Sequence, residues 1–149
     1  MWVGLIVMLV GAAEPEAKWV HEARSQLYAA PLVADCCPAP GLEVVISDSE
    51  ARRLRCVGAD GKQIWEYDGG WKKRLTSQAA MSRTARPGKT TLAVGNGDGS
   101  VDCVDGESGT RLWKAQVGKV EWSNVVWADL GGDGRDELVV ASEETGLTA

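Results

Sequence analysis

The chain has 149 residues, a formal net charge of −5, and seven tryptophans but no phenylalanine. This length suffices for one domain with a sizeable core but is short for a closed ring of β-sheets. Acidic and basic residues are interspersed, which argues against the clustered basic surface that nucleic-acid-binding proteins carry. We therefore expect one domain and no nucleic-acid partner.

The first ten residues form an apolar run, and Gly11, Ala12 and Ala13 follow it. An apolar run that ends in small residues is typical of a secretory signal peptide, and this one is too short to span a bilayer. The sequence therefore predicts a signal peptide over residues 1–13, no stable membrane span, and a secreted or periplasmic protein. Because no Lys or Arg lies in this stretch, a buried first strand or a reading frame begun too late are the alternatives.

A hairpin motif occurs twice, over residues 56–65 and 103–113. Each copy begins at a cysteine, turns on Asp and Gly, and ends on a tryptophan, and Asp-Gly turns favour tight hairpins. Residues 18–20 match the end of the motif without its beginning, so we expect an orphan last strand there. The tryptophans of these three segments, Trp19, Trp65 and Trp113, are expected to be structural anchors. Trp65 and Trp113 are expected to occupy equivalent environments between adjacent sheets.

Segments rich in β-branched residues surround the hairpins and predict further strands. They cover residues 33–35, 42–47, 90–95, 124–129 and 136–142, and the second unit also runs through residues 77–83. Cys103 follows Cys56 by 47 residues, and a period of this size with four strands per unit is typical of β-propeller blades. We expect an all-β fold with units at about 20–65, 66–113 and 114–149, the last one incomplete.

Two to three such units fall below the ~4–8 blades that radial closure requires. The expected structure is thus an open arc of blades. Its unpaired strand edges would favour self-association.

The second hairpin resembles the tryptophan-docking motif of the pyrroloquinoline-quinone-type β-propellers. Cys103, Asp105, Ser108, Gly109 and Trp113 stand on that motif, with Cys in place of Ala and Ser in place of Thr. The earlier copy is one residue shorter. Residues 128–140 resemble the FG-GAP repeat of integrin-like and related bacterial extracellular propellers. The resemblances together cover nearly all of residues 18–149, and they imply a propeller fold without fixing a function, because such propellers serve as enzymes, assembly factors and adhesive scaffolds.

The FG-GAP-like segment supplies the candidate metal ligands, Asp129, Asp133 and Glu137. Alternating oxygen ligands around a sharp Gly turn can surround Ca²⁺. Gly131 stands where the resembled family has Asp or Asn, so one ligand is missing and any Ca²⁺ would bind weakly. The alternative is a turn in which Asp side chains accept hydrogen bonds from neighbouring N–H groups. Calcium is the cofactor that the sequence suggests.

The four cysteines leave disulfide connectivity open. Cys56 and Cys103 hold the same place in successive repeats and are expected to be small buried hydrophobes. Cys36 and Cys37 lie in a Pro-rich loop; in some enzymes of the resembled family an adjacent-Cys disulfide ring covers the quinone. The alternative is that these are loop thiols or partners in other bridges. No catalytic residue is identified, since His21, the single histidine, has no evident catalytic partner nearby.

These observations favour a non-enzymatic scaffold that binds a protein or carbohydrate ligand through loops on one face of the blades. The basic stretches at residues 71–74 and 83–89 are interpreted as solvated loops. One rival is a piece of a periplasmic quinone-dependent dehydrogenase, which would need a quinone pocket. Another is a truncated product without independent function.

Overall fold

The computed structural model describes residues 3–9, 16–23 and 26–149. These residues form strands, turns and loops, and they include no helix that could cross a membrane. In chain order the described strands are β1 (Val3–Leu9), β2 (Glu16–Ala23), β3 (Leu32–Ala34), β4 (Glu43–Asp48), β5 (Arg53–Val57), β6 (Gln63–Tyr67), β7 (Ala80–Arg86), β8 (Lys89–Gly95), β9 (Ser100–Asp105), β10 (Arg111–Gln116), β11 (Val125–Ala128), β12 (Glu137–Ser142) and β13 (Gly146–Thr148).

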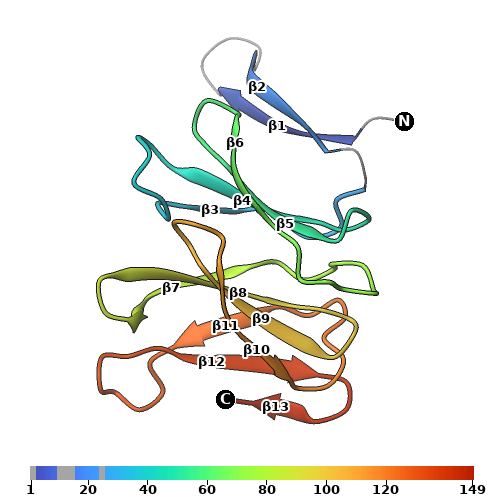
Figure 1. The fold of residues 1–149 in the computed structure, drawn as a ribbon, viewed down its shortest axis with the longest axis vertical. Helices are drawn as coiled ribbons and strands as arrows, with labels where there is room; N and C mark the ends of the chain where they lie inside the picture. The colour runs from blue at the N-terminus through green and yellow to red at the C-terminus, as the bar shows by residue number, and fades with distance from the viewer. Residues whose placement is uncertain (1–2, 10–15, 24–25) are drawn as a thin grey trace.

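The strands form four antiparallel sheets that follow one another along the chain from the top to the bottom of Figure 1. The first sheet pairs β1 with β2. The second and third sheets have four strands each, in the orders β3-β4-β5-β6 and β7-β8-β9-β10, and the fourth sheet is β11-β12-β13. Successive four-stranded antiparallel sheets whose strands follow sequence order are typical of β-propeller blades, and in this chain the sheets form an open arc. The expected fold class is confirmed.

The apolar run at the N-terminus contains a strand. β1 pairs antiparallel with β2, and Val7 lies opposite Trp19. The prediction of an orphan strand at residues 18–20 is therefore wrong, because the hydrophobic run supplies its partner. The expected cleavage site at the end of residues 1–13 lies outside the described residues, so the signal peptide stays a prediction.

Each central sheet contributes to two cores, because alternate side chains of a strand point to opposite faces. On β4, Val45 packs toward the third sheet, whereas Val44 and Ile46 pack toward the first. β8 divides its residues in the same way, with Leu92 facing the second sheet and Ala93 facing the fourth. The blades are thus joined by apolar layers, and the layer between the second and third sheets holds the site described next.

Candidate functional site

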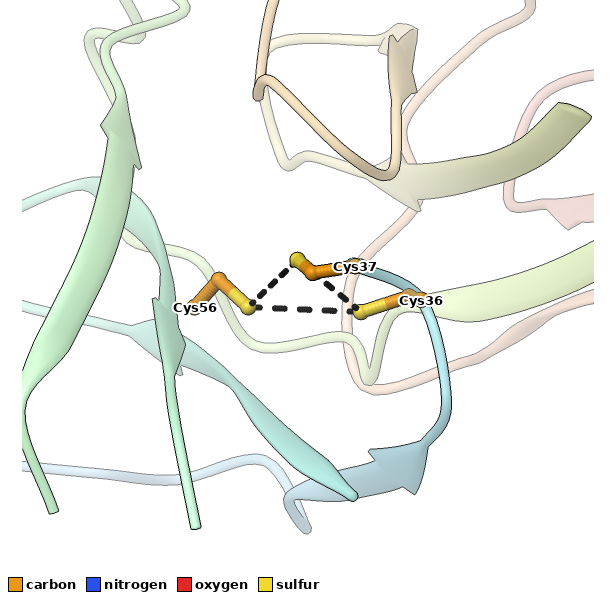
Figure 2. Close-up of side chains that lie close together, drawn as sticks. All are labelled: Cys36, Cys37 and Cys56. Atoms are coloured by element: carbon orange, nitrogen blue, oxygen red, sulfur yellow. Dashed lines mark hydrogen bonds between the residues drawn. The ribbon is translucent and has the colours of Figure 1, made fainter. Parts of the chain in front are cut away.

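Three cysteine thiols meet between the second and third sheets (Figure 2). Cys36 and Cys37 lie in the loop that joins β3 to β4, and Cys56 lies in β5. The Sγ atoms are separated by 4.0 Å between Cys36 and Cys37, 3.9 Å between Cys36 and Cys56, and 3.7 Å between Cys37 and Cys56. All three side chains are buried, and none forms a disulfide. We call this group the cysteine cluster.

A buried carboxylate holds the loop that carries two of these thiols. Glu43, the first residue of β4, is fully buried, and its Oε2 accepts hydrogen bonds from the backbone N–H groups of Cys36 at 2.8 Å and Cys37 at 3.1 Å. Its Oε1 is buried and has no hydrogen-bond partner among the described residues. Because β4 also pairs with β5, placing Val45 opposite Cys56, one strand fixes both sides of the cysteine cluster.

The three thiols differ in acidity. The hydrogen bond with Cys56 lowers the pKa of the Cys36 thiol, although burial and Glu43 act in the opposite direction. Burial and the charge of Cys36 raise the pKa of Cys37 to about 11. The hydrogen bond with Cys36, followed by burial, raises the pKa of Cys56 well above its usual value. Cys36 is therefore the first thiol to become a thiolate, the form that binds metals and attacks disulfides.

A pocket of about 330 Å³ leads to two members of the cysteine cluster. Cys36 and Cys37 line it, together with Arg83, Lys89 and Glu107 among others. The thiols are thus buried in the protein but adjacent to a polar opening. Among the described residues, the cysteine cluster is the one group of three or more His, Cys, Asp or Glu side chains in which all potential metal-ligand atoms lie within 4.8 Å of one another.

Sequence reasoning missed this cluster. It placed Cys36 and Cys37 in a loop and treated Cys56 as a small buried hydrophobe. The burial of Cys56 and Cys103 is confirmed, since both are fully buried. Only the return of the β3–β4 loop over β5 brings the thiols together, and no spacing in the sequence signals that return.

Two of the three hairpin tryptophans contact the turn of the following sheet. The Trp19 indole N–H donates to the Ala59 carbonyl at 3.0 Å, and the Trp65 indole N–H donates to the Gly106 carbonyl at 2.9 Å. Trp113 differs, because this residue is 41% exposed whereas Trp65 is 7% exposed. The expectation that Trp65 and Trp113 occupy equivalent environments is therefore wrong. No described hairpin turn meets Trp113 in the way that the Gly106 turn meets Trp65.

The candidate calcium loop is exposed, and its carboxylates accept hydrogen bonds from the backbone. Asp129 accepts from the N–H groups of Asp133 at 3.0 Å and Gly134 at 2.9 Å, and Glu137 accepts from the N–H of Leu130 at 2.8 Å. Such contacts are those expected of a turn in which acidic side chains accept hydrogen bonds from neighbouring N–H groups, the alternative to a Ca²⁺ site. Calcium binding by Asp129, Asp133 and Glu137 stays a prediction.

A second feature that the sequence did not indicate is an exposed aromatic surface built from Tyr28, Arg74 and Trp122. The rings of Tyr28 and Trp122 meet edge to face with centroids 5.8 Å apart, and the Arg74 guanidinium lies over the Tyr28 ring at 5.9 Å. Each residue comes from the loop that precedes the first strand of a different sheet. The basic stretch at 71–74 is thus more than a solvated loop, because Arg74 belongs to this aromatic surface.

Hydrogen bonds connect the loops that carry the aromatic surface. The backbone N–H of Gln78 donates to the Asn124 side chain at 2.9 Å, and the Gln78 side chain donates to the Pro31 carbonyl at 3.1 Å. The N–H of Trp122, a residue at φ +60°, donates to Thr76 Oγ1 at 3.3 Å. A positive φ is unfavourable for a bulky side chain. The neighbouring loop therefore helps to hold the indole in its exposed position.

Comparison with known proteins supports the fold. No protein-family model matches the chain, and no curated protein sequence matches it. Among solved structures, BamB from Moraxella catarrhalis is similar, with a TM-score of 0.58 and 17% sequence identity over 97% of this chain. The chain spans 46% of the length of that protein. At this identity the similarity shows the β-propeller fold alone.

Proposed function

We propose that the chain is a non-enzymatic β-propeller scaffold that binds a protein partner through the aromatic surface. The observation that carries this proposal is the meeting of Tyr28, Arg74 and Trp122 from three successive blades. Tyr, Arg and Trp are the residues most enriched at the energetic centres of protein interfaces. Trp122 and Tyr28 are 69% and 42% exposed, so both remain available to a ligand.

The geometry favours a protein over a carbohydrate ligand. A sugar ring stacks on a free, flat aromatic face, but Arg74 lies over the Tyr28 ring, and the two aromatic rings meet at 79°. Arg74 also pairs with Glu50 at 2.8 Å, which adds a charged rim beside the rings. An apolar centre with a charged rim is the usual anatomy of a protein interface.

The test is selection of peptides from a random library on the wild-type chain, followed by affinity measurement with labelled peptides. Trp122→Ala is expected to weaken binding by roughly 30-fold, the equivalent of a hot-spot loss of about 2 kcal/mol. Leu130→Ala is the matched control, because Leu130 is also apolar and 61% exposed but lies at the other end of β11. Peptides that bind both variants equally would contradict the proposal, and carbohydrate binding lost in Trp122→Ala would assign the surface to glycans.

We also propose that the protein is exported through the apolar run at its N-terminus. Cleavage after Ala13 would remove the residues that form β1, so β1 and a cleaved leader are alternative fates of the same segment. N-terminal sequencing after expression in a Gram-negative host decides between them. A mature chain that begins at Glu14 supports export, whereas an exclusively cytoplasmic chain that retains Met1 contradicts it.

The relationship to the pyrroloquinoline-quinone-type and FG-GAP propellers is likewise proposed here. The contacts of Trp65 with the Gly109 turn and of Trp19 with the Gly61 turn support it, because a Cβ added to either glycine would lie within 3.0 Å of the indole. Weak calcium binding at Asp129–Glu137 belongs to the same proposal. Calorimetry on wild type and Asp133→Ala tests it, and a Ca²⁺ heat that the substitution leaves unchanged would exclude this loop.

A further inference from the structure

The cysteine cluster has the geometry of a three-coordinate metal site. Its sulfurs form a nearly equilateral triangle with sides of 3.7, 3.9 and 4.0 Å. A point at the centre of that triangle lies about 2.2 Å from each sulfur, close to the ~2.3 Å between a d¹⁰ ion such as zinc and a thiolate. The cluster therefore requires little rearrangement to accept an ion.

The residues around the cysteine cluster are arranged like those that surround the ligands of a metal site. The Glu43 carboxylate fixes the backbone of Cys36 and Cys37 through two hydrogen bonds. Outer contacts of this kind orient the ligands of metal sites. The other oxygen of the same carboxylate, Glu43 Oε1, is buried and has no hydrogen-bond partner among the described residues, so the described contacts do not complete this region. The pocket beside Cys36 and Cys37 supplies an entry path.

We propose that Cys36, Cys37 and Cys56 bind a single copper(I) ion through three thiolates, at the junction of the second and third blades. Soft sulfur ligands select copper(I) or zinc over hard cations. Zinc takes four ligands in structural sites, but the described residues offer no fourth Cys, His, Asp or Glu ligand atom within 4.8 Å of all three sulfurs. Copper(I) is satisfied by three thiolates in a plane.

The binding of copper(I) by the three thiols requires no oxidant or reductant. A copper(I) donor complex delivers the ion, three Cu–S bonds form, and the thiol protons pass to solvent. Neither copper nor sulfur changes oxidation state. The site adds to the proposed scaffold function and is independent of it, because the aromatic surface lies on different loops.

The test is an anaerobic titration of the reduced full chain with copper(I) in competition with a chromogenic copper(I) chelator. One copper(I) per chain is expected, and Cys56→Ser should weaken binding by 100-fold or more. Cys103→Ser is the matched control, since Cys103 is also fully buried and occupies the same place in the next repeat but lies outside the cluster. It should leave the copper(I) affinity within about twofold of wild type. Near-ultraviolet circular dichroism establishes that each variant is folded.

X-ray absorption on the wild-type complex keeps the proposal testable if Cys56→Ser fails to fold. Three sulfur neighbours at about 2.2–2.3 Å are expected. The proposal would be overturned if X-ray absorption showed two sulfur neighbours, or nitrogen or oxygen neighbours in place of sulfur. It would also be overturned if Cys56→Ser and Cys103→Ser lost copper(I) affinity equally, or if the wild-type chain retained no copper(I) against the chelator. Preferential retention of zinc in a competition between the two metals would overturn the choice of copper(I).

Discussion

Trp65 and Trp113 occupy the same place in two repeats but differ in what covers them. Trp65 is buried, and its indole N–H bonds to Gly106, whereas Trp113 is 41% exposed. Trp65→Ala should therefore lower the free energy of unfolding by roughly 3–5 kcal/mol, as expected for a buried large aromatic. Trp113→Ala should cost about 1 kcal/mol or less. Urea unfolding of both variants measures the difference, and equal costs would contradict this account of the repeats.

Asp105 makes part of the stability depend on pH. Burial raises the pKa of its carboxyl, but the ion pair with Arg86 at 3.1 Å and hydrogen bonds from Ser108 together lower it by more, so the net shift is downward. A depressed folded-state pKa gives stability that is fully present above the unfolded value of about 3.9 and is lost as the pH falls through the folded value. Asp105→Asn should therefore be destabilised at pH 7 and approach wild type in acid.

Denaturant melts at pH 7 and at about pH 3 measure this effect, with Asp60→Asn as the control. Asp60 lies in the turn of the preceding hairpin and pairs with Lys62, but it is exposed, so solvent screens its interactions. A smaller difference between the two pH values is expected for the control. A destabilisation of Asp105→Asn that stays constant with pH would assign the effect to packing.

At the scale of elements, the turn between β9 and β10 is shaped to receive an indole. Gly109 has a φ of +68°, and a Cβ placed on it would lie 2.7 Å from the Trp65 ring. Gly88 has the same φ but open space around its would-be Cβ. Gly88→Ala should show the backbone strain alone, roughly 1–2 kcal/mol. Gly109→Ala should cost clearly more in thermal or urea unfolding, and equal costs would show that the ring does not press on this turn.

The hairpins were predictable because their chemistry is local. Asp-Gly turns and alternating β-branched residues specify a hairpin within about ten residues. What could not be predicted depends on contacts between sheets. Asp102 is an example: it is fully buried in β9, and it accepts hydrogen bonds from Tyr67 of β6 at 2.7 Å and from Trp71 of the β6–β7 loop at 2.8 Å. In the sequence it is one more acidic residue beside a turn.

The candidate sites were the least predictable part for the same reason. The cysteine cluster joins thiols from a loop and a strand, and the aromatic surface joins loops 46 to 48 residues apart. Repeat spacing could have indicated that Tyr28, Arg74 and Trp122 hold corresponding positions, but it does not indicate that the rings of the first and third loops meet. The β1–β2 pairing was ambiguous because a short apolar run suits both a leader and a strand.

At the scale of the whole molecule, the sheets behave as a linear series in which each one packs on its neighbours. Separate apolar layers join the first sheet to the second, the second to the third, and the third to the fourth. A series of this kind loses the most stability when an internal layer is disturbed, because the sheets on both sides of that layer lose apolar contacts. The layer that contains the cysteine cluster is the internal one, so copper(I) binding there should raise the melting temperature of the chain.

The fourth sheet leads to the last prediction, which concerns self-association. β13 pairs with β12 on one side and with no described strand on the other, and its three residues are exposed, Leu147 by 75%. An exposed strand edge with an apolar side chain recruits strands from other molecules. The purified 149-residue chain should therefore show concentration-dependent association in sedimentation velocity. Leu147→Lys should reduce it, since a charge on an edge strand opposes pairing, whereas Leu130→Lys, at a similarly exposed leucine outside the edge, should not. A compact monomer at every concentration would show that the β13 edge does not recruit partners.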